Sequence, residues 1–179
     1  MPRLGKLSLN FYHRELAGKA CQRVKKSDNV RALIRQMLRL MQQHDGTGLS
    51  APQVGVFLQL AVVRLPPSSA TQVLINPEIV SWGGKDFLGT ESCLSLPPTE
   101  RAKARIWRSE IVHVRSGTLE DPDAAQLTIY RGAAARIVQH EIDHLDGVFF
   151  IDRCQPVGKA NVLRAYESFL LGQGELVHG

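Results

Sequence analysis

The sequence predicts an α+β fold in which mixed or antiparallel β-sheets pack around a central helix, with further helices towards the N-terminus and the C-terminus. Segments with strand character outnumber the helical ones, and they do not alternate with helices as a parallel α/β fold requires. The predicted helix over 132–147 is rich in alanine and branched aliphatic residues, which indicates a position inside the protein. A length of 179 residues suits one domain, and no internal repeat divides it, so residues 1–179 are expected to form a single domain.

A first amphipathic helix is predicted within residues 27–46. Ser27 or Asp28 can cap its start, and Gly46 offers a left-handed residue at its end. Its apolar residues recur at three- and four-residue spacing, which predicts one buried face: Val30, Ile34, Met37, Leu38 and Met41.

The remaining segments are assigned from their pattern of apolar residues and chain breakers. The glycine-rich stretch 46–55 is expected to be a connector, and 83–105 a loop or irregular strand. The segments 110–116 and 126–132 are expected to pair as antiparallel strands. Other strands are expected over 57–65, over 71–80 with an interruption at Pro77, and over 148–152, and a last helix begins near 158 and frays towards 179.

Composition narrows the class of protein. The chain has 44% hydrophobic and 22% charged residues, and no apolar run approaches membrane-spanning length. Three scattered cysteines favour a reducing compartment over a disulfide framework. The cytoplasm is therefore expected, and an organelle matrix is the alternative because no acidic residue precedes Glu15. The net charge of +5 comes from dispersed residues, so no sequence-specific nucleic-acid binding is expected.

The stretch "HEIDH" carries the strongest chemical signal. On a helix, His140 and His144 lie one turn apart on the same face and can bind one metal ion. Glu141 follows the first histidine, where it can accept a proton from a water molecule that the ion activates. A divalent metal lowers the pKa of such a water from about 15.7 to about 7. The alternative is a pair of histidines that only make hydrogen bonds in a core.

A catalytic divalent site generally has three protein ligands and one open position. Cys93, in the polar loop "TESCLSLPP", is a candidate for the third ligand, because a cation stabilises its thiolate. The alternative is a buried thiol without a metal. A metzincin site needs a third histidine soon after the motif, but the only later one is His178.

Three separated stretches, "GTGLSAPQVG", "ESCLS" and "QHEIDHLDG", together resemble the three motifs of peptide deformylases, in the order of that family. The segments "INPEIV" and "YHRELAGKACQRV" are also similar to the family, so the resemblance covers about residues 10–170. It implies that Cys93, His140 and His144 bind one divalent metal. Ferrous iron is the expected ion in the cell, and Zn²⁺, Ni²⁺ and Co²⁺ are the alternatives.

The resemblance further implies hydrolysis of the N-formyl group from the initiating methionine of nascent peptides. Glu141 is then the general base and later the general acid, while the Gln53 side-chain amide and the Leu94 backbone N–H stabilise the oxyanion. The implied substrate-binding residues are Gly48, which bonds the substrate backbone, together with Thr47, Ser92 and Ile137. Glu91 and Asp143 are expected to orient the ligands.

Two departures from the family pattern bear on substrate preference. Ser92 stands where the family usually has glycine, and Gly89 stands where many members have a larger residue that would narrow the pocket. A deformylase-like hydrolase with another acyl substrate, and a homologue that binds without turnover, are therefore the alternatives. Formylmethionyl nascent peptides are the expected partners, and no membrane partner is expected. A transient ribosome contact is left open, because the tail is less basic than the docking helix of some bacterial members.

Overall fold

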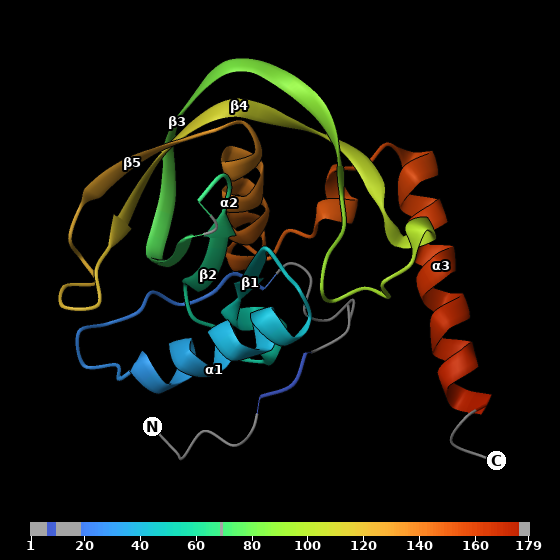
Figure 1. Cartoon of the computed structure of the whole chain (residues 1–179), viewed down its shortest axis with the longest axis horizontal. Helices are drawn as coiled ribbons and strands as arrows, with labels where there is room; N and C mark the ends of the chain where they lie inside the picture. The colour runs from blue at the N-terminus through green and yellow to red at the C-terminus, as the bar shows by residue number, and fades with distance from the viewer. Residues whose placement is uncertain (1–6, 10–18, 69, 176–179) are drawn as a thin grey trace.

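The computed structural model describes residues 7–9, 19–68 and 70–175. One antiparallel sheet arches over a central helix, and two more helices pack outside it (Figure 1). The α+β class with a central helix is therefore confirmed. The elements in chain order are α1 (Arg31–Gln43), β1 (Gly48–Ser50), η1 (Ala51–Val54), β2 (Leu60–Leu65), β3 (Ala70–Glu91), η2 (Glu100–Ala102), β4 (Ala104–Gly117), β5 (Gln126–Arg131), α2 (Gly132–Leu145), η3 (Phe150–Arg153) and α3 (Pro156–Glu175).

The sheet has five strands in the order β1-β2-β3-β4-β5, and every neighbouring pair is antiparallel. Strands β4 and β5 pair from Ile111↔Arg131 to Ser116↔Gln126, which confirms the predicted antiparallel pair. The long strands β3 and β4 form the arch in Figure 1, and they bring the end of β3 to the far side of the molecule.

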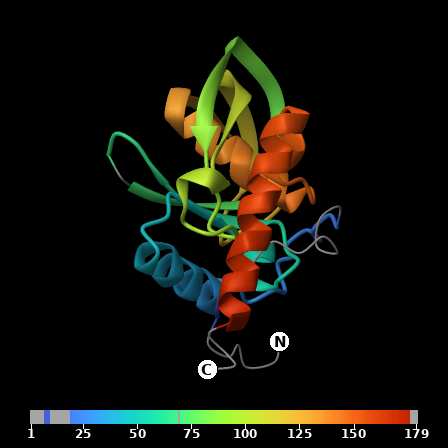
Figure 2. The ribbon, with the colours of Figure 1, turned by 90° about the vertical axis from the view of Figure 1, so that its right-hand side faces the viewer.

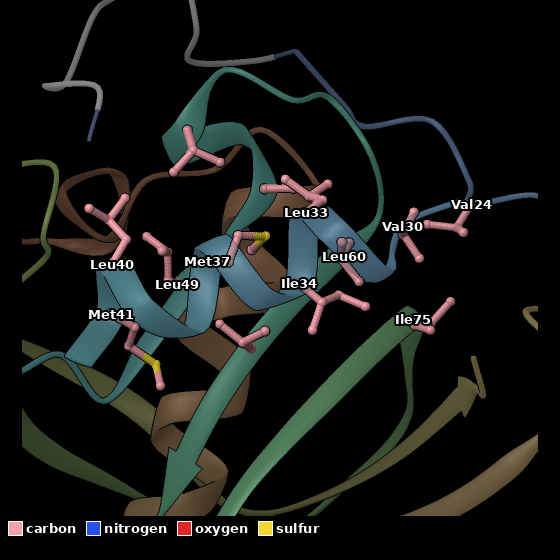
Figure 3. Packing of buried hydrophobic residues seen from close by; sticks show 13 residues of the cluster. Val24, Val30, Leu33, Ile34, Met37, Leu40, Met41, Leu49, Leu60 and Ile75 are labelled. Atoms are coloured by element: carbon pink, nitrogen blue, oxygen red, sulfur yellow. The ribbon is translucent and has the colours of Figure 1, made fainter. Parts of the chain in front are cut away.

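Helix α1 covers one part of the sheet through its predicted apolar face. Its buried residues include Leu33, Ile34, Met37 and Met41, which pack against Leu60 and other residues of the sheet (Figure 3). Leu38, predicted for the same face, is only partly buried against this cluster. Burial of each such side chain contributes about 1.5–3 kcal/mol, so this cluster anchors the loop that follows α1.

Helix α2 lies under the arch, and from Val138 to Leu145 every residue is buried. Ala135, Val138 and Ile142 pack against β2, β3 and β4, which fixes the helix against the inner face of the sheet. The left-handed Gly147, with φ 77°, ends it as predicted. Helix α3 lies outside these layers, at the right of Figure 1 and in front of the other elements in Figure 2. None of the helices in the described part of the chain is long and apolar enough to cross a membrane.

For residues 83–105 the loop alternative was wrong at both ends, because 83–91 continue β3 as an irregular strand with a register shift, and 104–105 begin β4. Glycine and polar residues do not show the alternating apolar pattern of a strand, so such a strand is hard to predict when its position is fixed by pairing with a partner strand. The long pairing also has register shifts between Ile75 and Glu78 and between Gly83 and Asp86. The first shift contains Pro77, which cannot donate to the ladder, and this explains the predicted interruption there.

Four local predictions were also wrong. The segment 46–55 contains β1 and η1 rather than only a connector, and 148–152 falls largely in the 3₁₀ turn η3 rather than a strand. Helix α1 has no side-chain cap, since the Asp28 carboxylate accepts from the Lys25 N–H instead. Its left-handed end is Asp45, with φ 51°, rather than Gly46. Residues 12–18 of "YHRELAGKACQRV" and the last four residues of the tail lie outside the described part.

Candidate metal centre

Three donor atoms from two distant segments meet at the middle of α2. His140 and His144 point from one face of the helix, with their Nε2 atoms 3.2 Å apart. The Cys93 Sγ lies 3.3 Å from the His144 Nε2, and the three donor atoms all lie within 4.8 Å of one another. Cys93 is placed there because it is the second residue after the end of β3, which the arch carries to this helix.

The spacing of these atoms fits a single divalent ion. Tetrahedral bonds of about 2.3 Å to sulfur and about 2.0–2.1 Å to imidazole nitrogen separate the ligand atoms by about 3.3–3.6 Å. The two shorter separations, 3.2 Å between the imidazole nitrogens and 3.3 Å from nitrogen to sulfur, are close to that range. The side chains are also well enclosed, with exposed fractions of 8% for Cys93, 8% for His140 and 3% for His144.

Glu91 orients the first histidine from behind. Its Oε2 lies 2.9 Å from the His140 Nδ1, so the Nε2 of that ring faces the other two donors. Burial alone would raise the pKa of Glu91, but Arg108 and His140 hold this pKa well below its usual range. The carboxylate is therefore ionised behind the ring. Burial alone would lower the pKa of His140, but Cys93 and Glu91 raise it well above its usual range, whereas burial and the nearby His140 lower the pKa of His144 well below its usual range.

Glu141 lies beside the donor atoms and is held there by a hydroxyl group. Its Oε2 accepts a hydrogen bond of 2.5 Å from the Ser50 side chain. Burial raises the pKa of Glu141, which suits a group that accepts and returns a proton near neutral pH. A Cβ atom at Gly48 would lie 2.2 Å from the Glu141 Oε1, so only glycine leaves room for this carboxylate.

Gln53 is held with its amide nitrogen towards the donor group. The Ser50 N–H donates to its Oε1 at 2.8 Å, which fixes the orientation of the amide. Its Nε2 therefore faces Cys93 Sγ at 3.3 Å and the Ser95 hydroxyl at 3.2 Å. The capping box at the start of η1 supplies this geometry, because Ser50 is the N-cap and Gln53 is the third residue of the turn. A side-chain amide fixed in this way can donate to a developing oxyanion.

A cleft of about 1040 Å³ opens over this group. Leu94 and Ile137 are half-buried in its wall, while Thr47 and Ser92 are exposed at its edge. Of the predicted site residues, His144 and Asp143 do not line the cleft: His144 is 3% exposed, and Asp143 lines a cavity on the other side of the helix. The site residues that the sequence predicts and that do line the cleft are Thr47, Gly48, Gln53, Ser92, Cys93, Leu94, Ile137, His140 and Glu141.

Comparison with known families identifies the chain. The family model described as "Polypeptide deformylase" matches residues 8–160. The chain belongs to the peptide deformylase family. Peptide deformylase 2 of Gloeobacter violaceus is 42% identical over 133 residues, which are 72% of this chain and 68% of that protein.

Solved deformylase structures share the fold. The enzyme from Legionella pneumophila superposes with a TM-score of 0.83 at 30% identity, covering 95% of this chain and 98% of that one. The enzyme from Synechococcus elongatus, solved in complex with actinonin, gives a TM-score of 0.78 at 36% identity over 90% and 86% of the two chains. Peptide deformylases are metal-dependent hydrolases that remove the N-formyl group from nascent peptides, and this is the function of the chain.

The arginines that surround Glu91 were not predicted from the sequence. Arg108 donates to both oxygens of Glu91 at 2.9 Å, and it also contacts Asp143. Arg153 binds the same Asp143 from the other side. The sequence did indicate that Arg108 is buried, because it lies two residues after the core residue Ile106 in β4 and therefore points to the same face of the strand. A charged residue that points into the core needs a partner of opposite charge, and Glu91 and Asp143, the two acids expected near the ligands, are those partners.

The position of Arg136 explains the space at Gly89, where many members of the deformylase family have a larger residue. The Arg136 guanidinium contacts the Glu91 carboxylate at 2.8 Å and the Phe87 carbonyl oxygen at 2.8 Å. A Cβ atom at Gly89 would lie 2.8 Å from that guanidinium. The volume that glycine leaves is therefore filled by Arg136 rather than added to the substrate pocket, which removes one of the two reasons to expect a different acyl substrate.

Proposed function

We propose that the chain acts as a single catalytic domain, residues 1–179, in which Cys93, His140 and His144 hold the metal of this deformylase. The spacing of the three donor atoms, all within 4.8 Å of one another, is the observation that carries the proposal. Ferrous iron is the proposed ion in the cell, and Zn²⁺, Ni²⁺ and Co²⁺ suit the same thiolate and imidazole ligands. The ion, when bound, acidifies a water molecule and polarises the formyl carbonyl.

We assign the proton transfer to Glu141. It accepts the proton of the attacking water and returns it to the amine that leaves with the peptide, so formate and a free methionyl amine result. The Ser50 hydroxyl at 2.5 Å and the glycine at position 48 hold the carboxylate in one place. Burial raises the pKa of this carboxylate, which makes it a better proton acceptor.

We assign the oxyanion to the side-chain amide of Gln53 and the backbone N–H of Leu94. Gln53 is oriented before any substrate arrives, through its hydrogen bonds to Ser50 and Ser95. Loss of one such donor generally lowers turnover by about 10²–10³-fold. Gly48 is proposed to bind the substrate backbone, and Thr47, Ser92 and Ile137 are proposed to contact the methionyl residue.

The proposed substrates are N-formylmethionyl nascent peptides in the cytoplasm, with an organelle matrix as the alternative. A transient contact with the ribosome fits a substrate that emerges there. Neither a membrane nor a specific nucleic-acid sequence enters the scheme. A preference for formyl over acetyl and longer acyl peptides is expected, and Ser92→Gly tests whether the exposed serine at the cleft edge modifies it.

The test compares Glu141→Gln with the matched control Glu167→Gln, whose carboxylate is exposed on α3. Both proteins are prepared without air, because a thiolate beside ferrous iron is prone to oxidation. Formate release from a formyl-Met peptide is expected to fall by about 10²–10⁴-fold in the first variant, with bound metal unchanged. Normal turnover in Glu141→Gln would contradict the assignment of the base.

A further inference from the structure

A second cavity, of about 660 Å³, lies on the other side of α2 from the metal cleft. Gln139, Ile142 and Asp143 line it from the helix, whereas His140 and Glu141 line the metal cleft. Its other walls come from β3 and β4 of the arch, from Arg23 and Gln59, and from Asp146 and Arg153 after the helix. None of the side chains that open into this cavity is among the metal, proton-transfer or oxyanion residues assigned above, so its composition calls for a separate explanation.

Two exposed tryptophans wall this cavity, and they are the only two in the chain. Trp82 is 62% exposed and Trp107 is 58% exposed. Exposed indoles gathered at a concave surface are unfavourable in water without a partner, and tryptophan is the residue type that most often carries binding energy at interfaces. Each indole offers a flat face on which a planar group can stack.

The side chains that line the cavity carry four carboxylates, those of Glu78, Asp86, Asp143 and Asp146, against three guanidinium groups, although the whole chain carries +5. Asp86 and Asp146 line it, both are exposed, and neither forms an ion pair with any residue in the described part of the chain. The arginines in its wall are already engaged: Arg108 and Arg153 bind Asp143, and Arg23 binds Asp123 at 3.3 Å. An incoming cation would therefore find two carboxylates outside any of these pairs.

We propose that this cavity is a docking site for an arginine-bearing segment of a partner protein. A guanidinium is planar, stacks on indole faces, and donates two hydrogen bonds to a carboxylate. Trp82 and Trp107 supply the stacking surfaces, and Asp86 and Asp146 supply the acceptors. Charge complementarity separates this partner from RNA and from anionic lipid, because both would bring phosphates towards the two carboxylates.

The tryptophans make the test direct, since all tryptophan fluorescence of the protein comes from this cavity. The metal-loaded protein is titrated with the peptide Gly-Arg-Gly-Arg-Gly-Arg at low salt, and with matched peptides that carry lysine or glutamate. A saturable change in emission with the arginine peptide is expected, weaker with lysine and absent with glutamate. The net charge of +5 opposes non-specific binding of a cationic peptide, so saturation indicates a local site.

Variants separate a docking site from general attraction. The double variant Asp86→Asn, Asp146→Asn is expected to weaken binding at least tenfold, whereas the control Glu110→Gln, Glu167→Gln, with exposed carboxylates outside the cavity lining, binds as the parent does. Trp82→Phe and Trp107→Phe each leave one tryptophan, whose emission then reports on the binding alone. The proposal would be overturned if the arginine peptide gave no saturable change, or if the two double variants bound it equally. It would also be overturned if a formyl-Met peptide displaced the arginine peptide, or if only an RNA oligonucleotide or phosphatidylserine vesicles gave a saturable change.

Discussion

The two sides of helix α2 treat charge in opposite ways. On the rear side, which faces the second cavity, Asp143 is bound by two arginines, Arg108 and Arg153, so the charges are compensated within the protein. On the front side, which faces the metal cleft, a thiol and two imidazoles face one another at 3.2–3.3 Å, and a carboxylate supports them from behind. The difference teaches that the buried carboxylate on the rear side already has its partners in the folded protein, whereas the donor atoms on the front side are arranged to receive a metal ion.

The largest expected effect tests the rear side. Arg108→Met should lower the free energy of unfolding by about 3–5 kcal/mol, because Glu91 and Asp143 lose a buried partner. Urea unfolding measures it, and Arg115→Met is the control, since its guanidinium is exposed and lies 3.6 Å from Glu78. The control should change stability by about 0.5 kcal/mol or less. Equal stability of the two variants would mean that the rear network does not stabilise the fold.

The next effect tests the front side. Gly48→Ala should lower formate release by about a hundredfold, because its Cβ would lie 2.2 Å from the Glu141 Oε1 and displace the carboxylate. Gly83→Ala is the matched control, since its Cβ would make an ordinary contact of 3.6 Å with Ile111. If both variants keep full turnover, the position of the Glu141 carboxylate is not what the alanine disturbs.

Gly89→Ala tests the contact between Arg136 and Glu91, the carboxylate that both the front and the rear side of α2 share. The new methyl group would push the Arg136 guanidinium away from Glu91, which should lower the free energy of unfolding by about 1–3 kcal/mol. Thermal unfolding is compared with Gly158→Ala, where the helical position and a 3.6 Å contact to Cys154 allow a gain of up to about 1 kcal/mol. Loss of stability in both variants would show that the arginine contact is not the cause.

The smallest effect concerns the hydroxyl of Ser50. Ser50→Ala removes the hydrogen bond to Glu141 but keeps the backbone N–H that orients Gln53. One hydrogen bond to a charged group is worth about 1.5–3 kcal/mol at most, and the front cleft can admit water in its place. kcat/KM for a formyl-Met peptide should therefore fall about tenfold or less. A loss as large as that of Glu141→Gln would make Ser50 part of the proton transfer.

The front side of α2 was more predictable from the sequence than the rear. Histidines one turn apart are brought together by helix geometry alone, so the sequence was enough to pair His140 with His144. Cys93 was a candidate third ligand from its polar loop, but only the family resemblance chose it over a buried thiol, because the meeting depends on the length of the β3–β4 arch. The part of that arch over 83–91 was predicted only as a loop or irregular strand, since its polar residues pair through a partner strand rather than through their own pattern. The contacts of Arg108 and Arg136 were not predicted, because their partner Glu91 is brought to them by this arch.

The central claim is that Cys93 joins the two histidines around one ion, and X-ray absorption of the anaerobically loaded protein tests it most directly. The wild-type protein should show one sulfur and two nitrogen ligands per metal. Cys93→Ala should lose the sulfur and most of the bound metal, while the control Cys154→Ala, a half-buried thiol outside the donor group, keeps both. Unchanged metal content and an unchanged spectrum in Cys93→Ala would contradict the account.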